Sequence, residues 1–163
     1  MKVRRTPPPE RRILGWREWV ALPDLGVRDI KAKLDTGART SSLHAFHLER
    51  YAHQGVAMVR FEVHPVQRAR TASVAVEAEV VDERMVRSSD GREETRPVIV
   101  TTLEMGGQTW PIELTLTRRD AMGFRMLLGR QALRRRAVVD PGRSYALGRR
   151  RARQEAEHRT SAT

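Results

Sequence analysis

The sequence predicts an all-β fold, a closed or nearly closed β-barrel with one short helix near its C-terminal end. Three observations support this prediction. Many short segments alternate apolar and polar residues, as half-buried strands do. Turn-forming Gly, Pro, Asp and Ser residues separate these segments. An apolar period near 3.6 residues is not sustained anywhere, so the pattern favours many short strands arranged as a barrel.

The first half of the chain contains the strands that lead to the most informative motif. Residues 13–22 are expected to form the first strand, and the Pro23-Asp24 pair followed by Gly26 signals a turn. Residues 27–34 then place mainly apolar side chains on every second position, which predicts a half-buried strand. Further strands are expected at residues 42–51, 55–64 and 71–86.

The second half continues with hairpins and ends with the helix. Residues 88–91 (Ser-Ser-Asp-Gly) predict a hairpin turn, and Gly106-Gly107 predicts a second, tight one. A short helix is expected at residues 130–135. The remaining strands are expected at residues 95–103, 108–117, 126–129 and 137–140, with a last edge strand at 144–147.

Length, charge and composition indicate one domain with two basic tails. Of 163 residues, 13–147 are expected to form the domain. Residues 1–12, which are rich in proline, and residues 148–163 carry +4 and +3 of the net charge of +11, and both are expected to be disordered. The sequence has no cysteine, no apolar run long enough for a membrane helix and no secretory h-region, which favours a cytoplasmic location.

One motif offers a candidate for chemistry. Asp35-Thr36-Gly37 directly follows an apolar strand, and Ala38 comes next. About 90 residues later, Leu127-Leu128-Gly129 precedes the expected helix. Three residues alone occur by chance, and an Asp-Thr-Gly segment can also be an ordinary turn at the end of a strand. Its strand context gives the motif its weight.

These segments resemble a known family. Residues 31–43 (KAKLDTGARTSSL), 96–98 (RPV), 113–116 (ELTL) and 126–130 (MLLGR) are similar to the family labelled ATP-dependent zinc proteases. That family is regarded as retropepsin-like, and its members are often associated with ATP-grasp glutamate ligases. The resemblance covers about residues 13–147, and it implies a retropepsin-like barrel and a functional link to such a ligase.

The resemblance also implies a set of site residues. Asp35 would be the catalytic carboxylate, in a loop formed with Thr36, Gly37 and Ala38. Gly37 is expected to allow a turn that other residues cannot adopt. Leu127, Leu128 and Gly129 would brace that loop, and a hairpin around Ser89, Asp90 and Gly91 would form a flap over the substrate.

An aspartic peptidase needs two carboxylates that share one proton. The other Asp residues lack the Asp-Thr-Gly context, so this mechanism requires a homodimer in which two copies of Asp35 meet. The substrate would be a peptide or protein. The excess of positive charge and the link to glutamate ligases suggest glutamate-rich peptides or tails.

Other functions have weaker support. His44 and His47 are three residues apart with Ala45 after the first, so the helical zinc-protease motif is absent and no metal is expected. The phosphate-binding Gly-x-x-x-x-Gly-Lys pattern is also absent, and no cofactor is expected. Ser41 and Ser42 are expected to be hydrogen-bonding loop residues.

A catalytically silent barrel that binds a peptide or partner protein is the alternative to the peptidase. A nucleic-acid-binding module is less favoured, because the arginine runs 134–136 and 149–151 contain no aromatic residue.

Overall fold

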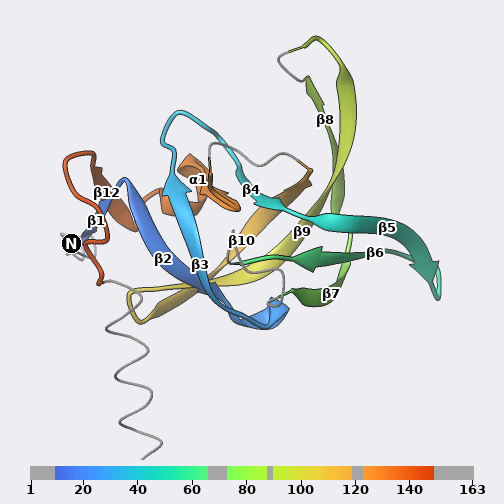
Figure 1. The fold of residues 1–163 in the computed structure, drawn as a ribbon, viewed down its shortest axis with the longest axis horizontal. Coiled ribbons are helices and arrows are strands. Elements are labelled where there is room, and N and C mark those ends of the chain that lie inside the picture. The colour runs from blue at the N-terminus through green and yellow to red at the C-terminus, as the bar shows by residue number, and fades with distance from the viewer. Residues whose placement is uncertain (1–9, 66–72, 88–89, 119–122, 149–163) are drawn as a thin grey trace, which may run out of the picture.

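Six strands form a closed barrel (Figure 1). The computed structural model describes residues 10–65, 73–87, 90–118 and 123–148. The predicted all-β barrel is confirmed, since β9 also pairs with β10 and thereby closes the ring. The strands follow the order β10 (Gln108–Thr117), β4 (Ser41–His44), β11 (Met126–Leu128), β3 (Val27–Leu34), β2 (Arg17–Leu22) and β9 (Glu93–Met105).

Two tight connections shape the barrel as the sequence predicts. Between β2 and β3 the chain makes a 3-10 turn, η1 (Pro23–Leu25), which ends at Gly26 with a φ of 71°. Gly106 and Gly107 connect β9 to β10 with φ values of 59° and 78°. Two successive left-handed residues match the twist of a hairpin, and glycine adopts them without steric cost.

The short strand β11 lies between two other strands and fixes their ends. It pairs in parallel with β3, where Leu128 lies opposite Leu34, and antiparallel with β4, where Leu127 lies opposite Ser42. The only α-helix in the described part of the chain, α1 (Arg130–Leu133), follows directly. Residues distant in sequence, at the ends of β3 and β11, are therefore held side by side.

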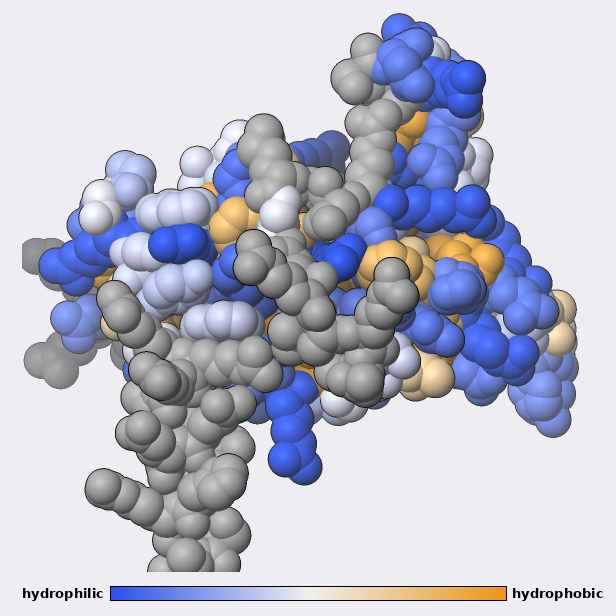
Figure 2. All heavy atoms as spheres, viewed as in Figure 1, coloured by the Kyte–Doolittle hydropathy of each residue, from blue (hydrophilic) through white to orange (hydrophobic). Residues whose placement is uncertain are grey.

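Two arms project from the barrel (Figure 1). The first belongs to a separate three-stranded antiparallel sheet of β5 (Phe46–His53), β6 (Val56–Val63) and β7 (Val74–Glu79). The second is the hairpin of β8 (Asp82–Arg87) with the N-terminal half of β9. Hydrophilic side chains cover the ends of both arms on the face drawn in Figure 2. The arms thus extend from the barrel as solvated hairpins.

The N-terminal and C-terminal parts of the domain meet in a small sheet. β1 (Arg12–Gly15) and β12 (Ala137–Asp140) pair in parallel, with Ile13 opposite Val138. Both of these side chains are about half exposed, at 52% and 49%. The sheet lies beside the barrel, and its strand β12 follows α1 closely in the sequence.

The core fills the barrel with aliphatic side chains from every one of its strands. Burial of this apolar surface is the main favourable term in folding. The largest fully buried apolar residues are Phe61, Leu14, Leu22, Ile30, Leu43, Ile99, Leu103, Leu114, Leu116, Met126 and Leu128.

Several sequence-based expectations were wrong in detail. The expected strand 13–22 is interrupted at Trp16, and its two halves belong to different sheets. The expected strand 42–51 breaks at Ala45, where the chain leaves the barrel for the first arm. The stretch 71–86 divides into β7 and β8. In each case strand-forming residues continue through a change of sheet, so a strand-like sequence alone does not mark the break.

The expected edge strand at residues 144–147 was also wrong. This segment is a turn, and Tyr145 has a φ of 55°. The buried carboxylate of Glu18 accepts hydrogen bonds from the backbone N–H groups of Gly15, Ala146 and Leu147, each at 3.1 Å. The carboxylate of Glu18 thus satisfies the N–H groups of residues 146 and 147 that a neighbouring strand would otherwise have to accept from, so these residues do not have to join a sheet.

Candidate active site

The loop that carries Asp35 begins where β3 ends. Asp35 Oδ1 accepts hydrogen bonds from the backbone N–H of Gly37 at 2.9 Å and of Ala38 at 3.2 Å. Asp35 itself is partly buried, and no hydrogen bond to its second oxygen, Oδ2, is found among the described residues. One oxygen therefore shapes the turn while the other is available for chemistry.

Gly37 acts differently from the sequence-based expectation. Its φ lies outside the left-handed region, so the turn does not require the conformational freedom of glycine. A Cβ at this position would lie 3.1 Å from Asp35 Oδ1, which is a tight contact. The small size of Gly37 is what lets the carboxylate approach the backbone so closely.

The strand β11 supports the loop through its backbone. The N–H of Asp35 donates to the carbonyl oxygen of Leu128 at 2.8 Å. Gly129 is packed so tightly that a Cβ would lie 2.5 Å from the carbonyl oxygen of Thr40 and 2.9 Å from that of Ala38. The buried Ser41 hydroxyl accepts a hydrogen bond from the N–H of Gly129 at 3.0 Å. The structure thus brings Leu128 and Gly129 against the Asp35 loop.

Arg130, which the sequence analysis did not single out, makes the most direct side-chain contact with this loop. Its Nη1 donates to the carbonyl oxygens of Thr36 at 3.0 Å and Gly37 at 2.9 Å. Its backbone N–H donates to the carbonyl oxygen of Ala38 at 2.8 Å. The sequence contained one signal for this role, because Arg130 directly follows Leu127-Leu128-Gly129, the segment expected to brace the loop.

A cleft of about 750 Å³ separates the loop from the second arm. Ala38 and Leu127 line one side of it, and Met85 and Val86 of β8 line the other. β8 of the hairpin predicted as a flap therefore forms part of the wall of the cleft. Asp90 and Gly91 lie at the described end of that hairpin, where Gly91 has a φ of 82°, whereas Ser89 lies outside the described residues.

The charges that line the cleft differ in how far they are neutralised. Arg84 contacts Glu113 at 2.6 Å, and this hydrogen bond raises the pKa of the Arg84 guanidinium. Arg96 pairs with Glu94 at 3.4 Å. Arg39, by contrast, has no carboxylate partner among the described residues. Arg39, the cleft arginine without a described carboxylate partner, therefore lies next to the Asp35 loop.

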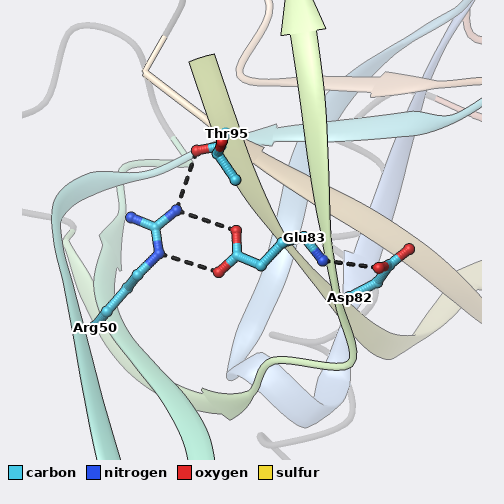
Figure 3. Close-up of polar contacts among 4 residues, drawn as sticks. All are labelled: Arg50, Asp82, Glu83 and Thr95. Atoms are coloured by element: carbon cyan, nitrogen blue, oxygen red, sulfur yellow. Dashed lines mark hydrogen bonds and ion pairs between the residues drawn. The ribbon is translucent and has the colours of Figure 1, made fainter.

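The two arms are tied together by one arginine (Figure 3). Arg50 of β5 contacts both oxygens of Glu83 on β8, with Nε at 3.1 Å and Nη2 at 3.3 Å. The same Nη2 donates to the carbonyl oxygen of Thr95 on β9 at 3.1 Å. A forked contact of this kind fixes orientation as well as distance. The base of the candidate flap is thus anchored to the first arm.

His44 and His47, the two histidines considered as metal ligands, have different surroundings. His44 is buried and packs beside Phe46 with ring centroids 4.3 Å apart, whereas His47 is exposed with a φ of 51°. Within the residues that the structure describes, no group of three or more His, Asp or Glu side chains could hold a metal ion. No helix in this part of the chain is long and apolar enough to span a membrane.

The barrel and the braced Asp-Thr-Gly loop, with the β8–β9 hairpin beside the cleft, define a retropepsin-like architecture. A family model described as "Retropepsin-like aspartic endopeptidase RimB" matches residues 13–150. The chain therefore belongs to the RimB-like family, and the family expected from the motifs is confirmed.

Similar proteins agree with this assignment. The chain is 48% identical over 136 residues to a probable alpha-L-glutamate ligase of Shewanella pealeana and 50% identical over 136 residues to one of Parasynechococcus marenigrum. These matches cover 83% of this chain but only 30% and 29% of the two relatives. The chain thus spans about a third of the length of these curated relatives.

A solved structure shares the fold. The protein Lpg0085 of Legionella pneumophila, whose function is described as unknown, matches with a TM-score of 0.69 and 28% identity. The match covers 85% of this chain and all of that one. The solved chain therefore shares this fold over its whole length.

Proposed function

We propose that this chain is an aspartic endopeptidase in which two copies of Asp35 form the catalytic pair across a homodimer. The observation that carries the proposal is the state of the Asp35 carboxylate. Oδ1 is held by two backbone N–H groups, and Oδ2 has no hydrogen bond among the described residues. A carboxylate fixed at one oxygen and open at the other is suited to positioned proton transfer.

The proposed reaction uses the pair as one acid and one base. The ionised Asp35 removes a proton from a water molecule, whose oxygen then attacks the carbonyl carbon of the peptide bond. The protonated Asp35 of the second copy donates its hydrogen to the carbonyl oxygen. The first Asp35 then passes the proton it took from water to the leaving nitrogen, and the second Asp35 takes a proton back from a hydroxyl of the tetrahedral intermediate. The C–N bond breaks as the C=O bond forms again, which leaves an acid, an amine and the pair in its starting protonation state. No metal or cofactor takes part in this proposed route.

The substrates we propose are glutamate-rich peptides or protein tails. Arg39 lines the cleft next to the Asp35 loop, and its guanidinium has no carboxylate partner among the described residues. The relatives named probable alpha-L-glutamate ligases support a functional link to the addition of glutamate. A cationic cleft would raise the local concentration of an acidic substrate. The cytoplasmic location expected from the cysteine-free sequence stays a prediction.

The proposal is tested by cleavage of a diverse peptide library and of proteins with glutamate tails. Wild type is compared with Asp35→Asn, each with and without a metal chelator. We expect cleavage by the wild type that resists the chelator and is lost in Asp35→Asn, while the variant keeps its fold and its oligomeric state. Cleavage that survives the substitution would refute the assignment of Asp35, and loss of cleavage on chelation would indicate a metal enzyme.

A further inference from the structure

A second groove adjoins the Asp35 loop. It has a volume of about 560 Å³ and contacts Thr36. Leu133, Ala137 and Val139 contribute apolar side chains. Its charged residues are Arg39, Arg130 and Arg134, and no Asp or Glu is among its described lining residues. We call this the arginine groove.

In the part of the chain that the structure describes, no carboxylate pairs with the arginines of this groove. Elsewhere in the described chain, arginines such as Arg60 and Arg143 pair with carboxylates. Among the described residues, neither Arg39 nor Arg134 has such a partner, and Arg130 Nη1 contacts only the carbonyl oxygens of Thr36 and Gly37. The groove therefore offers three guanidinium groups to an anion from outside.

The proposed dimer brings two such grooves together. An aspartic pair needs its carboxylates about 3 Å apart. Thr36 follows Asp35 directly and lines the arginine groove, so two copies that join their Asp35 residues also join their arginine grooves at the interface. At an ionic strength of about 0.01 M the Debye length is about 30 Å, so these like charges repel across the whole interface.

We propose that the arginine groove is a binding site for a polycarboxylate chain, and that its occupancy is what lets two copies bring their Asp35 residues together. This inference rests on the proposed function. Arg39 and Gln131 line both the arginine groove and the cleft, so the two sites adjoin at these residues. No aromatic side chain is among the described lining residues, so the groove offers no stacking surface for a nucleic-acid base.

The experiment measures dimerisation of the full chain by sedimentation at about 0.01 M ionic strength. The probe is poly-D-glutamate, which carries the charge of the L-polymer but resists peptidases; an oligothymidylate of equal charge is the comparison. The variants are Arg39→Ser with Arg134→Ser, and Arg134→Ser alone in case the double variant fails to fold. Arg28→Ser is the matched control, because Arg28 is exposed on β3 at the end opposite Asp35.

We expect poly-D-glutamate to tighten wild-type dimerisation by about tenfold or more, as linkage requires of a ligand that binds the dimer preferentially. The arginine variants should dimerise at low salt without the polymer, and Arg28→Ser should behave as the wild type. A dimer that forms regardless of polymer, or that responds to oligothymidylate alone, would overturn this inference and leave the proposed function intact. A chain that stays monomeric with the polymer and at high salt would overturn both.

Discussion

The Nη1 atom of Arg130 lies 2.9 Å from the carbonyl oxygen of Gly37, so the side chain of Arg130 holds the backbone of the Asp-Thr-Gly loop. The same atom also contacts the carbonyl oxygen of Thr36. Because carbonyl groups are the acceptors, the contact positions the loop without forming an ion pair with Asp35 itself. Arg130 is therefore a positioning residue in the proposed mechanism.

Arg130→Met should keep the fold and lower kcat by about tenfold or more, because the loop loses an orienting contact while the Asp35 carboxylate remains. KM should change less than kcat, and rescue by Arg130→Lys should be partial. Steady-state kinetics on a cleaved peptide give the comparison, with Arg28→Met as the control. If kcat falls only as far as the fraction of folded protein falls, Arg130 has a merely structural role.

Gly129→Ala should destabilise the protein by about 1–3 kcal/mol, since the added methyl group would overlap the backbone carbonyl of Thr40. Urea unfolding measures the change. Gly142→Ala is the control, because its nearest neighbour is the Asp140 side chain at 3.2 Å, which can move. Equal effects at the two positions would contradict the packing described for Gly129.

Glu18→Gln should lower the free energy of unfolding by about 1–3 kcal/mol. A neutral amide offers one acceptor oxygen where the buried carboxylate uses two to receive three N–H groups. Amide hydrogen exchange should increase at Ala146 and Leu147. Glu79→Gln on the exposed face of β7 serves as the control. Unchanged exchange at both amides would show that Glu18 does not hold the segment.

Arg50→Met should have little effect on global stability, below about 1 kcal/mol, because the ion pair with Glu83 is exposed. Its effect should instead be local, with faster hydrogen exchange along β8, since the flap hairpin loses its anchor to the first arm. Glu83→Gln should give the same pattern. Exchange rates in β8 that match the wild type would mean that the arms are held by other contacts.

The sequence predicted the barrel and the family better than the connections between sheets. Alternation identified β3, β6 and β10 because each keeps one face on the core along its length. It did not reveal the breaks at Trp16 and Ala45, where strand-forming residues continue from one sheet into another.

The candidate site was predictable only in part. The Asp35 loop and the strand Met126–Leu128 have a recognisable motif, and the structure places them together. The contacts of Arg130 and Glu18 depend on backbone groups supplied by distant segments. Backbone carbonyls and N–H groups are the same in every residue, so no sequence pattern marks them as partners.

The most direct test of the shared catalytic pair is to mix wild type with inactive Asp35→Asn at constant total concentration, after the subunits have exchanged. If each site needs Asp35 from both copies, peptidase activity falls as the square of the wild-type fraction, to about a quarter in an equal mixture. If each chain acts alone, activity falls in proportion, to about half. The first result is the one we predict, and a proportional fall would contradict the proposed pair.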